Sequence, residues 1–354
     1  MLKALKFVGL TLYAAVFVEA YTWYAVDDIR KGPSFTVYDA EHGLAMRKNF
    51  AGRRVTHEYD MSFTTGEQGF RGGTYDVVKP SGTLRVASVG NSQAFGVGVD
   101  DDETYCQLAE RELNERVDCD VQVMNMAVTE SKTDTVLSMW DKIVSFEPHV
   151  LLVRYDYWNF INPNLIYKVR DGQLVHRETF PNTGLRRRLE KVALLRHFEG
   201  FAWYGFVRLK LPTYLTRMRE ARDRMFTLHT QTPEAEKPPI SYDWKEFLQL
   251  KELLYRAEAA QLDVVFLKFP LYPHDVSDHF RSVNPNRDER FAALVDRDGV
   301  VVIDCSDLDM GRRPELYYPE DEHLNLLGHA ELARRVSDGL TGQLSSDCQG
   351  SGSK

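Results

Sequence analysis

The stretch that most constrains the fold of this chain is residues 85–99, which read RVASVGNSQAFGVGV. A short apolar run ends at Val89, Gly90-Asn91-Ser92 follows, and a helical pattern begins near Tyr105. This order predicts a strand that ends in a sharp turn bearing a serine. A serine on such a turn is exposed at the carboxyl edge of a sheet, where a base from elsewhere in the chain can meet it.

The far end of the chain supplies a candidate base. His323 follows two carboxylates, Glu320 and Asp321, just ahead of a predicted helix. A carboxylate two or three residues before a histidine can hold the imidazole in the right tautomer while the imidazole takes a proton from the serine. The two blocks therefore predict nucleophilic catalysis, with Ser92 and His323 as the reacting pair.

These two blocks resemble the SGNH/GDSL hydrolase family, whose first block is a Gly-Asp-Ser turn and whose last is an acid–histidine pair. The resemblance covers most of residues 38–342. The segment that leads into the serine turn, residues 66–92, looks like that of membrane-anchored bacterial members related to polysaccharide O-acetyltransferases and esterases. It implies Ser92 as nucleophile, His323 as base and Asp321 as the acid, with Glu320 as the alternative acid. His329 looks like the histidine in the first turn of the family's closing helix and is interpreted as structural.

The resemblance also implies where an oxyanion hole would lie. The family takes its donors from the backbone of the serine, the backbone of a block-two glycine and the side chain of a block-three asparagine. Here the glycine aligns with Glu130, and the asparagine aligns with Trp158, one residue before Asn159. We expect the amide of Glu130 and, through a one-residue bulge, the side chain of Asn159 to act as donors; otherwise the third donor is missing. Asn91 replaces the family's aspartate and supports a similar turn.

From residue 84 onward the sequence alternates between strand and helix patterns. This alternation is typical of a parallel sheet covered by helices on both faces, with ligands bound beyond the carboxyl ends of the strands. We predict an α/β fold with a doubly wound parallel sheet of the SGNH-hydrolase or flavodoxin-like type. The predicted strands are residues 84–89, 121–126, 150–153, 264–269 and 300–303, and the predicted helices are residues 103–116, 133–144, 244–260 and 326–340.

The flanking and inserted segments set the predicted domain limits. Residues 1–28 form a membrane anchor or signal segment, residues 29–80 a lead-in packed on the core, residues 81–344 the hydrolase-like domain and residues 345–354 a disordered tail. Residues 160–240 are an insertion that mixes arginines with aromatic residues. This mixture indicates either a helical cap packed on the core or an amphipathic lid on an anionic membrane surface.

The amino terminus carries a targeting signal. Lys3 and Lys6 precede the uncharged residues 7–18, and the apolar segment continues past Glu19 to residue 26. Counted across Glu19, the segment is long enough to cross a bilayer once, and the flanking charges place the amino end in the cytoplasm. A single-pass anchor over residues 7–26 and a cleaved secretion signal are both open. Either way, the catalytic domain is expected outside the cytoplasm, in the periplasm.

Composition narrows the classes of partner. A chain of 354 residues can bury one substantial core plus an insertion. The formal net charge of -8 argues against nucleic-acid binding, because no basic excess is present to neutralise phosphates. The cysteines lack metal-ligand spacing, so no metal is expected, and their pairing stays open: Cys106, Cys119, Cys305 and Cys348.

Together these features predict a serine esterase of the SGNH type that acts on acyl esters, acetyl esters above all, without a cofactor. Its substrate would be an ester or an acylated carbohydrate, in a setting that fits partners in exopolysaccharide modification. With a sugar hydroxyl in place of water, the same chemistry makes an O-acyltransferase acting on surface polysaccharide. The alternative from another class is a catalytically degenerate scaffold that binds carbohydrate or a partner.

Overall fold

The computed structural model describes residues 2–25, 35–39, 42–160, 167–170, 173–176, 243–272 and 286–351. The chain divides into two compact units, and the larger comprises residues 35–51, 61–184 and 239–354. Within the predicted insertion, the described elements are β8 (Tyr167–Arg170) and β9 (Gln173–His176), which pair antiparallel. The predicted cap or lid therefore lies outside the described residues.

The smaller unit contains helix α1 (Leu2–Ala25). Among the residues that the structure describes, we find no helix that is both long enough and apolar enough to cross a membrane. The membrane-spanning segment predicted over residues 7–26 is therefore not supported.

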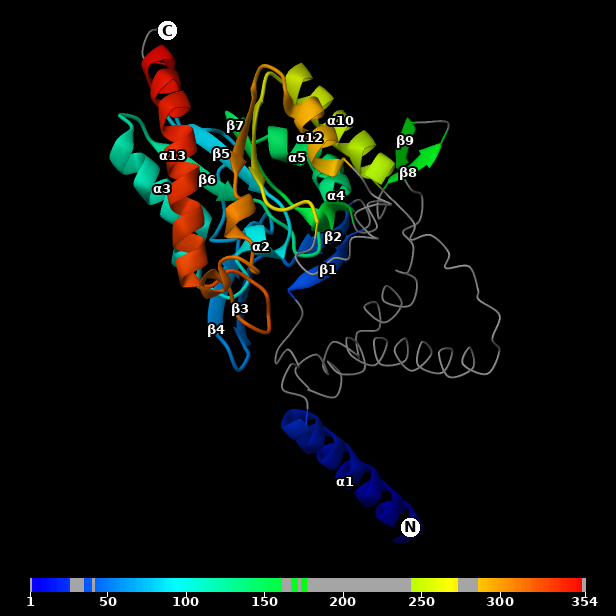
Figure 1. Cartoon of the computed structure of the whole chain (residues 1–354). Helices are drawn as coiled ribbons and strands as arrows, with labels where there is room; N and C mark the ends of the chain where they lie inside the picture. Colours follow the sequence, from blue (N-terminus) through cyan, green and yellow to red (C-terminus); the bar gives the residue numbers. More distant parts are fainter. Residues whose placement is uncertain are drawn as a thin grey trace. The chain divides into compact units, whose positions relative to one another are not determined.

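The core of the larger unit is a five-stranded parallel sheet (Figure 1). Its strand order is β11-β10-β7-β5-β6, so the chain enters the sheet at β5 and winds outward in both directions. Strands β5 and β7 are buried along their whole lengths, as expected for strands covered on both faces. Ligands bind such sheets where the strand order reverses, which is here between β5 and β7. The strands are β5 (Leu84–Val89), β6 (Val121–Asn125), β7 (Val150–Tyr155), β10 (Asp263–Lys268) and β11 (Val300–Asp304).

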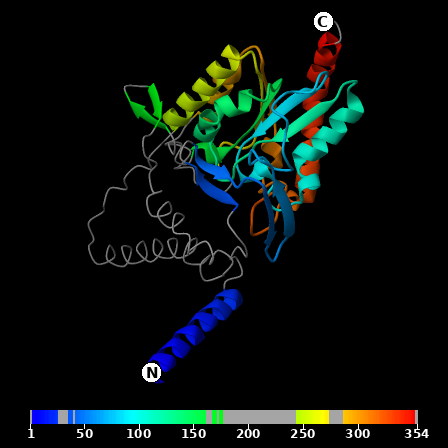
Figure 2. The same cartoon turned by 180° about the vertical axis from the view of Figure 1, so that it is seen from behind.

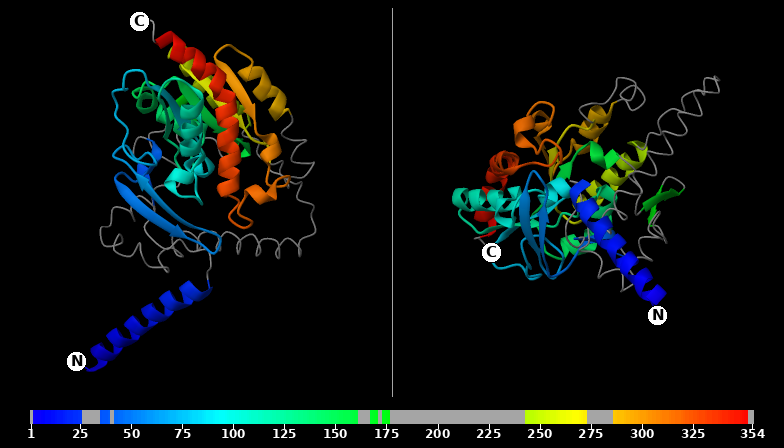
Figure 3. Two further views of the ribbon diagram at one scale, coloured as in Figure 1. Left: turned by 90° about the vertical axis from the view of Figure 1, so that its left-hand side faces the viewer. Right: turned by 90° about the horizontal axis from the view of Figure 1, so that it is seen from below.

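Helices cover both faces of this sheet. On one face α3 and α13 pack side by side (Figure 2, Figure 3), and on the other lie α4, α5, α10 and α12 (Figure 1). The predicted α/β architecture with a parallel sheet is therefore confirmed. The helices are α2 (Ser92–Phe95), α3 (Tyr105–Arg116), α4 (Thr133–Ser138), α5 (Trp140–Val144), α10 (Asp243–Ala259), α12 (Arg287–Val295) and α13 (Leu326–Ser351).

The lead-in consists of short strands. They are β1 (Thr36–Asp39), β2 (Gly43–Met46), β3 (Phe50–Val55) and β4 (Asp60–Thr65), and β1 pairs antiparallel with β2. The ring of Phe63 lies edge-on to Phe35 at 5.0 Å and to Phe95 at 5.7 Å between centroids. Because Phe95 belongs to α2, this aromatic cluster supports the turn that follows β5.

Two predicted elements differ in extent from the structure. The helix predicted over residues 133–144 is divided at Met139, where the backbone leaves helical geometry, into α4 and α5. The predicted disordered tail is wrong as far as Ser351, because α13 continues to that residue. Buried Leu344 and the disulfide of Cys348 hold this part of the chain, which its serine and glycine content alone does not reveal.

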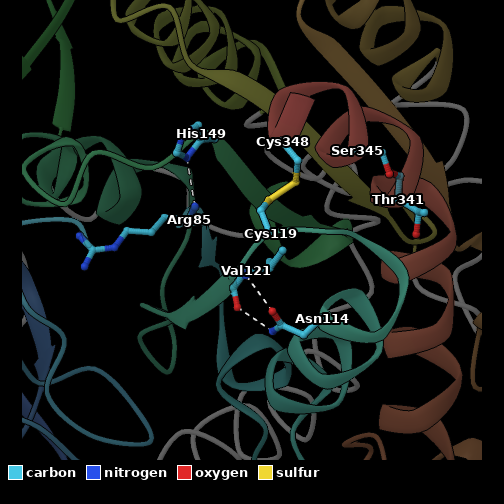
Figure 4. Close-up of a disulfide and its surroundings, with 8 residues drawn as sticks. All are labelled: Arg85, Asn114, Cys119, Val121, His149, Thr341, Ser345 and Cys348. Carbon is cyan, nitrogen blue, oxygen red and sulfur yellow. Dashed lines mark hydrogen bonds between the residues drawn. A yellow bond between two sulfur atoms is a disulfide. The ribbon is translucent and has the colours of Figure 1, made fainter. Parts of the chain in front are cut away.

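The disulfide joins Cys119 to Cys348, with 5.7 Å between the Cα atoms (Figure 4). Cys119 lies in the loop between α3 and β6. Asn114 of α3 fixes this loop, because its side chain donates to the carbonyl of Val121 at 2.8 Å and accepts from the amide of Val121 at 2.9 Å. The pairing that the sequence leaves open is thus Cys119 with Cys348, and the other two cysteines are buried thiols.

Candidate active site

The turn after β5 places Ser92 at the carboxyl edge of the sheet. Gly90 has a φ of 150°, and a Cβ added there would lie 2.8 Å from the Cβ of Ala94, so only glycine fits. The side chain of Asn91 accepts a hydrogen bond from the amide of Gln93 at 3.0 Å and caps α2, which starts at Ser92. A short helix therefore begins at the serine itself, ahead of α3, which begins at Tyr105 as the sequence predicts.

The loop before α13 brings His323 to this serine. The Nε2 atom of His323 lies 2.9 Å from the Oγ atom of Ser92, and its Nδ1 atom is hydrogen-bonded to Asp321. An ionised carboxylate only accepts hydrogen bonds, so Nδ1 carries the imidazole proton and Nε2 accepts from the serine hydroxyl. This arrangement is the one a general base needs to activate a serine.

The two candidate acids differ in position. Asp321 is largely buried, with 11% of its side chain exposed, and contacts His323 directly. Glu320 is exposed and is not among the residues that line the cavity beside Ser92. The structure thus brings Asp321, and not Glu320, to the imidazole.

Gln93, which the sequence analysis does not single out, ties the histidine loop to the serine turn. Its Nε2 atom donates to the carbonyl of Glu322 at 2.8 Å, and its Oε1 atom accepts from the amide of Leu324 at 3.0 Å. These two residues flank His323. Because Gln93 directly follows Ser92, this pair of bonds sets the distance between base and nucleophile.

Glu130 lies in the loop that follows β6. It has a φ of 65°, the left-handed conformation that favours glycine, and its side chain is exposed at the cavity. The neighbouring Ser131 donates its hydroxyl to the carbonyl of Gly90 at 2.5 Å, which ties this loop to the serine turn. The position that aligns with the family's glycine therefore has a glycine-like backbone while bearing a carboxylate.

Asn159 does not line the cavity beside Ser92. Its Nδ2 atom donates to the hydroxyl of Thr133 at 3.0 Å, and its Oδ1 atom accepts from the amide of Asp156 at 3.1 Å. The helical turn Tyr157–Phe160 after β7 directs this side chain toward α4, so it lines a separate small cavity. Its predicted role as an oxyanion donor has no geometric support.

Two charged residues at the end of β7, which the sequence analysis did not assign, lie at the site. The Oδ2 atom of Asp156 accepts from Nε of Arg154 at 3.2 Å and from Nδ2 of Asn91 at 3.4 Å. The guanidinium of Arg154 stacks on the ring of Phe269, 3.6 Å from its centroid. Both charged side chains are buried. The available signal was a charged pair at the end of an otherwise apolar, buried strand.

A cavity of about 260 Å³ opens beside Ser92 at the carboxyl ends of β5 and β7. One arginine and five carboxylates line it, and such an excess of negative charge favours a neutral ester over an anionic one. The charged lining residues are Glu130, Arg154, Asp156, Asp309, Asp321 and Glu322. Within the described ranges no group of three or more side chains of the metal-ligating types could hold a metal ion.

His329 lies in the interior. Its Nδ1 atom accepts from the amide of Tyr105 at 3.2 Å, and the two rings stack with centroids 6.0 Å apart. Burial lowers the pKa of His329 to about 3, so its imidazole is neutral. It packs α13 against α3 and does not line the cavity beside Ser92.

Comparison with known proteins finds neither a matching family model nor a matching curated protein. Solved structures do match. A lipase from a goat rumen metagenome is 14% identical over 74% of this chain and 99% of its own, with a TM-score of 0.43. A psychrotrophic esterase from Pseudoalteromonas sp. is 12% identical over 73% and 98%, with a TM-score of 0.42. A protein assigned to the G-D-S-L lipolytic family, from Desulfitobacterium hafniense, is 11% identical over 73% and 99%, with a TM-score of 0.40. At these identities and TM-scores the likeness assigns no activity to this chain.

Proposed function

We propose that this chain is a serine esterase of the SGNH type that acts on neutral acyl esters, acetyl esters of carbohydrates above all. The observation that carries the proposal is the hydrogen-bonded chain from Ser92 Oγ through His323 to Asp321, with 2.9 Å between Ser92 Oγ and His323 Nε2. A serine, a histidine and a carboxylate in this order define a nucleophile, its base and the group that orients the base.

The reaction follows from these positions. Ser92 Oγ attacks the acyl carbonyl while its proton passes to Nε2 of His323, and the carbonyl π electrons move to the oxygen. His323 then gives this proton to the departing alcohol as the bond to its oxygen breaks, which leaves an acyl-serine. Asp321 accepts the hydrogen bond from the Nδ1–H group of His323 throughout and stabilises the imidazolium. Water activated by His323 releases the acid; a sugar hydroxyl in its place would complete an acyl transfer.

The test is hydrolysis of 4-nitrophenyl acetate by the purified chain, followed by labelling of the serine with a fluorophosphonate and mass analysis. We expect turnover and a single label on Ser92. Ser92→Ala should lose both turnover and labelling. The control variant Ser145→Ala changes an exposed serine directly after α5 and should retain both. An inert wild-type protein whose Ser92 is not labelled would favour the binding scaffold instead.

Acceptor choice separates hydrolysis from transfer. The same acetyl donor is incubated with acetylated and unacetylated oligosaccharides, and acetate and acetyl-oligosaccharide are quantified. Release of acetate supports the esterase. Acetyl-oligosaccharide as the main product would replace the proposed esterase by an O-acyltransferase that uses the same serine.

We further propose that the domain works outside the cytoplasm. The support is the disulfide between Cys119 and Cys348, which joins residues 229 positions apart, since such bonds persist mainly in oxidising compartments. A fusion of alkaline phosphatase after Lys354 should be active in cells. An inactive alkaline phosphatase fusion, together with an active fusion to a reporter that folds only in the cytoplasm, would overturn this location.

A further inference from the structure

Arg154 has a hydrogen-bonding capacity that its structural contacts do not use. The Arg154 side chain is 4% exposed. Its Nε atom donates a hydrogen bond to Asp156. Its Nη1 atom is buried and has no hydrogen-bond partner in the part of the chain that the structure describes. A buried N–H group without an acceptor is costly, so each one in a folded protein calls for an explanation. Arg154 also lines the cavity that contains Ser92.

Arg154 lies beside the turn that presents Ser92. Strands β5 and β7 are neighbours in the sheet, with Val89 opposite Val153. The next residues, Gly90 and Arg154, are therefore also adjacent, and a Cβ added to Gly90 would lie 3.1 Å from the Cβ of Arg154. Asp156 accepts from both Arg154 and Asn91, which fixes the guanidinium against the turn that presents Ser92. The resemblance also expects the third donor close by, in the segment that directly follows β7.

The side chain expected as the third donor, that of Asn159, gives one amide hydrogen to Thr133 and lines a separate cavity. The developing oxyanion would also face the carboxylate of Glu130 at the cavity wall. A neutral donor offsets such a charge poorly, whereas a guanidinium held in a site shielded from water offsets it strongly.

We propose that Arg154 is a catalytic residue: it donates a guanidinium N–H to the oxyanion formed when Ser92 attacks the acyl carbonyl. No proton is transferred to or from Arg154. The serine oxygen bonds to the carbonyl carbon, the π electrons move to the carbonyl oxygen, and that oxygen accepts the hydrogen bond. Asp156 is the positioning residue that orients the guanidinium. This inference rests on the proposed esterase function and names a donor for its transition state.

The experiment compares Arg154→Gln, Asp156→Asn and the double variant, because Arg154 has a competing role as the partner of a buried carboxylate. An oxyanion donor acts in the transition state, so Arg154→Gln should lower kcat on 4-nitrophenyl acetate by about 10²- to 10³-fold with little change in KM. Asp156→Asn should stay within about tenfold of wild type, since the arginine remains. The double variant should be as slow as Arg154→Gln.

Recovery of the double variant to the level of Asp156→Asn would overturn the inference, because Arg154 would then only neutralise Asp156. If Arg154→Gln fails to fold, the double variant still decides the question, since it leaves no buried unpaired carboxylate. Arg334→Gln removes an exposed arginine of α13 and serves as the matched control, with unchanged kcat expected.

A second measurement separates transition-state binding from structure. Phenylboronic acid forms a tetrahedral, negatively charged adduct with an active serine, so its inhibition constant should rise about as much as kcat falls in Arg154→Gln. Guanidine added to Arg154→Gly should restore part of the rate. Unchanged boronate affinity in Arg154→Gln would refute the inference while leaving the esterase intact. A wild-type protein that neither turns over ester nor labels at Ser92 would refute the esterase, and the inference with it.

Discussion

The cavity beside Ser92 has two flanks that differ in how their polar groups are satisfied. On the nucleophile flank, Ser92, His323 and Asp321 form one chain in which each group has its partner. On the donor flank, the amide of Asn159 is bound to a neighbour while a guanidinium nitrogen of Arg154 has no partner within the described structure. The nucleophile flank is therefore complete without substrate, whereas the donor flank is complete only when a negatively charged oxygen is present.

The two flanks also differ in how far they extend into the protein. The nucleophile flank depends on two short loops that Gln93 holds together. The donor flank continues from Asn159 through Thr133 to Glu246 of α10, whose Oε1 atom accepts from the hydroxyl of Thr133 at 2.6 Å. Changes on the first flank should therefore affect the reaction with little effect on folding, and changes on the second should affect both.

The largest effect is expected on the nucleophile flank. Ser92→Ala and His323→Ala should each lower kcat by about 10⁶-fold, because the residues of such a triad act as a unit. Their melting temperatures should stay near that of wild type, since both side chains border the cavity. Steady-state kinetics with thermal unfolding as the control measures this, and a His323→Ala enzyme that keeps most of its rate would remove the base from the mechanism.

The next effect distinguishes the two acids. Asp321→Asn removes the acceptor that fixes the imidazole tautomer and should lower kcat by about 10⁴-fold. Glu320→Gln is the matched control one residue earlier, and its exposed side chain predicts a change within about twofold. Comparable losses in both variants would mean that the two carboxylates share the role.

The nucleophile flank was the part of the site that the sequence revealed. An apolar strand, a Gly-Asn-Ser turn and an acid–histidine pair are local patterns, and each residue type there follows from its chemistry. The acid was left open because Glu320 and Asp321 differ only in loop geometry, which depends on the left-handed Glu322 between them and the histidine. The sheet was equally readable, since strands and helices alternate along the sequence and β7 begins with a continuous apolar run.

The donor flank could not be derived in the same way. The roles of Arg154 and Asp156 depend on contacts between strands and turns that lie far apart in the sequence. The side chain of Asn159 is directed toward α4 by a helical turn that the sequence does not indicate. The helical tail eluded prediction for a related reason. Its polar composition favours disorder, and a disulfide to a residue 229 positions away decides otherwise. Local sequence patterns carry no information about such pairing between distant residues.

A smaller effect should appear in the pH dependence of stability on the donor flank. Burial raises the pKa of Glu246 to about 8, so the folded state keeps a proton that the unfolded chain loses near its ordinary pKa of about 4.5. Stability should therefore fall as the pH rises from about 4.5 to about 8, by at most about 1.4 kcal/mol per pH unit. Glu246→Gln removes this slope.

The measurement is denaturant unfolding of wild type and Glu246→Gln from pH 5 to pH 9. His329 acts in the opposite direction: burial lowers its pKa to about 3, so stability falls as the pH drops below about 6.5 toward 3. Because His329 is present in both proteins, the difference between their unfolding free energies isolates Glu246. A difference that does not change with pH would show that Glu246 is ionised in the fold.

The smallest effect is expected at Glu130, and it tests the donor flank most directly. Glu130 has a φ of 65°, which costs a non-glycine residue about 1 kcal/mol, so Glu130→Gly should be neutral to slightly stabilising after the entropy of the glycine is counted. The same substitution removes a carboxylate from the wall of the cavity where the oxyanion forms. Activity should be equal or up to about tenfold higher, because like charges near a developing anion are repulsive.

Glu130→Gln provides the matched control, since it removes the charge but keeps the backbone requirement. An increase in kcat shared by Glu130→Gly and Glu130→Gln assigns the effect to charge, and an increase confined to Glu130→Gly assigns it to the backbone. In an Arg154→Gln background the gain should grow, because the carboxylate is then no longer offset by the guanidinium. A loss of activity in Glu130→Gly would instead show that the carboxylate takes part in binding substrate, and the donor flank would need a different description.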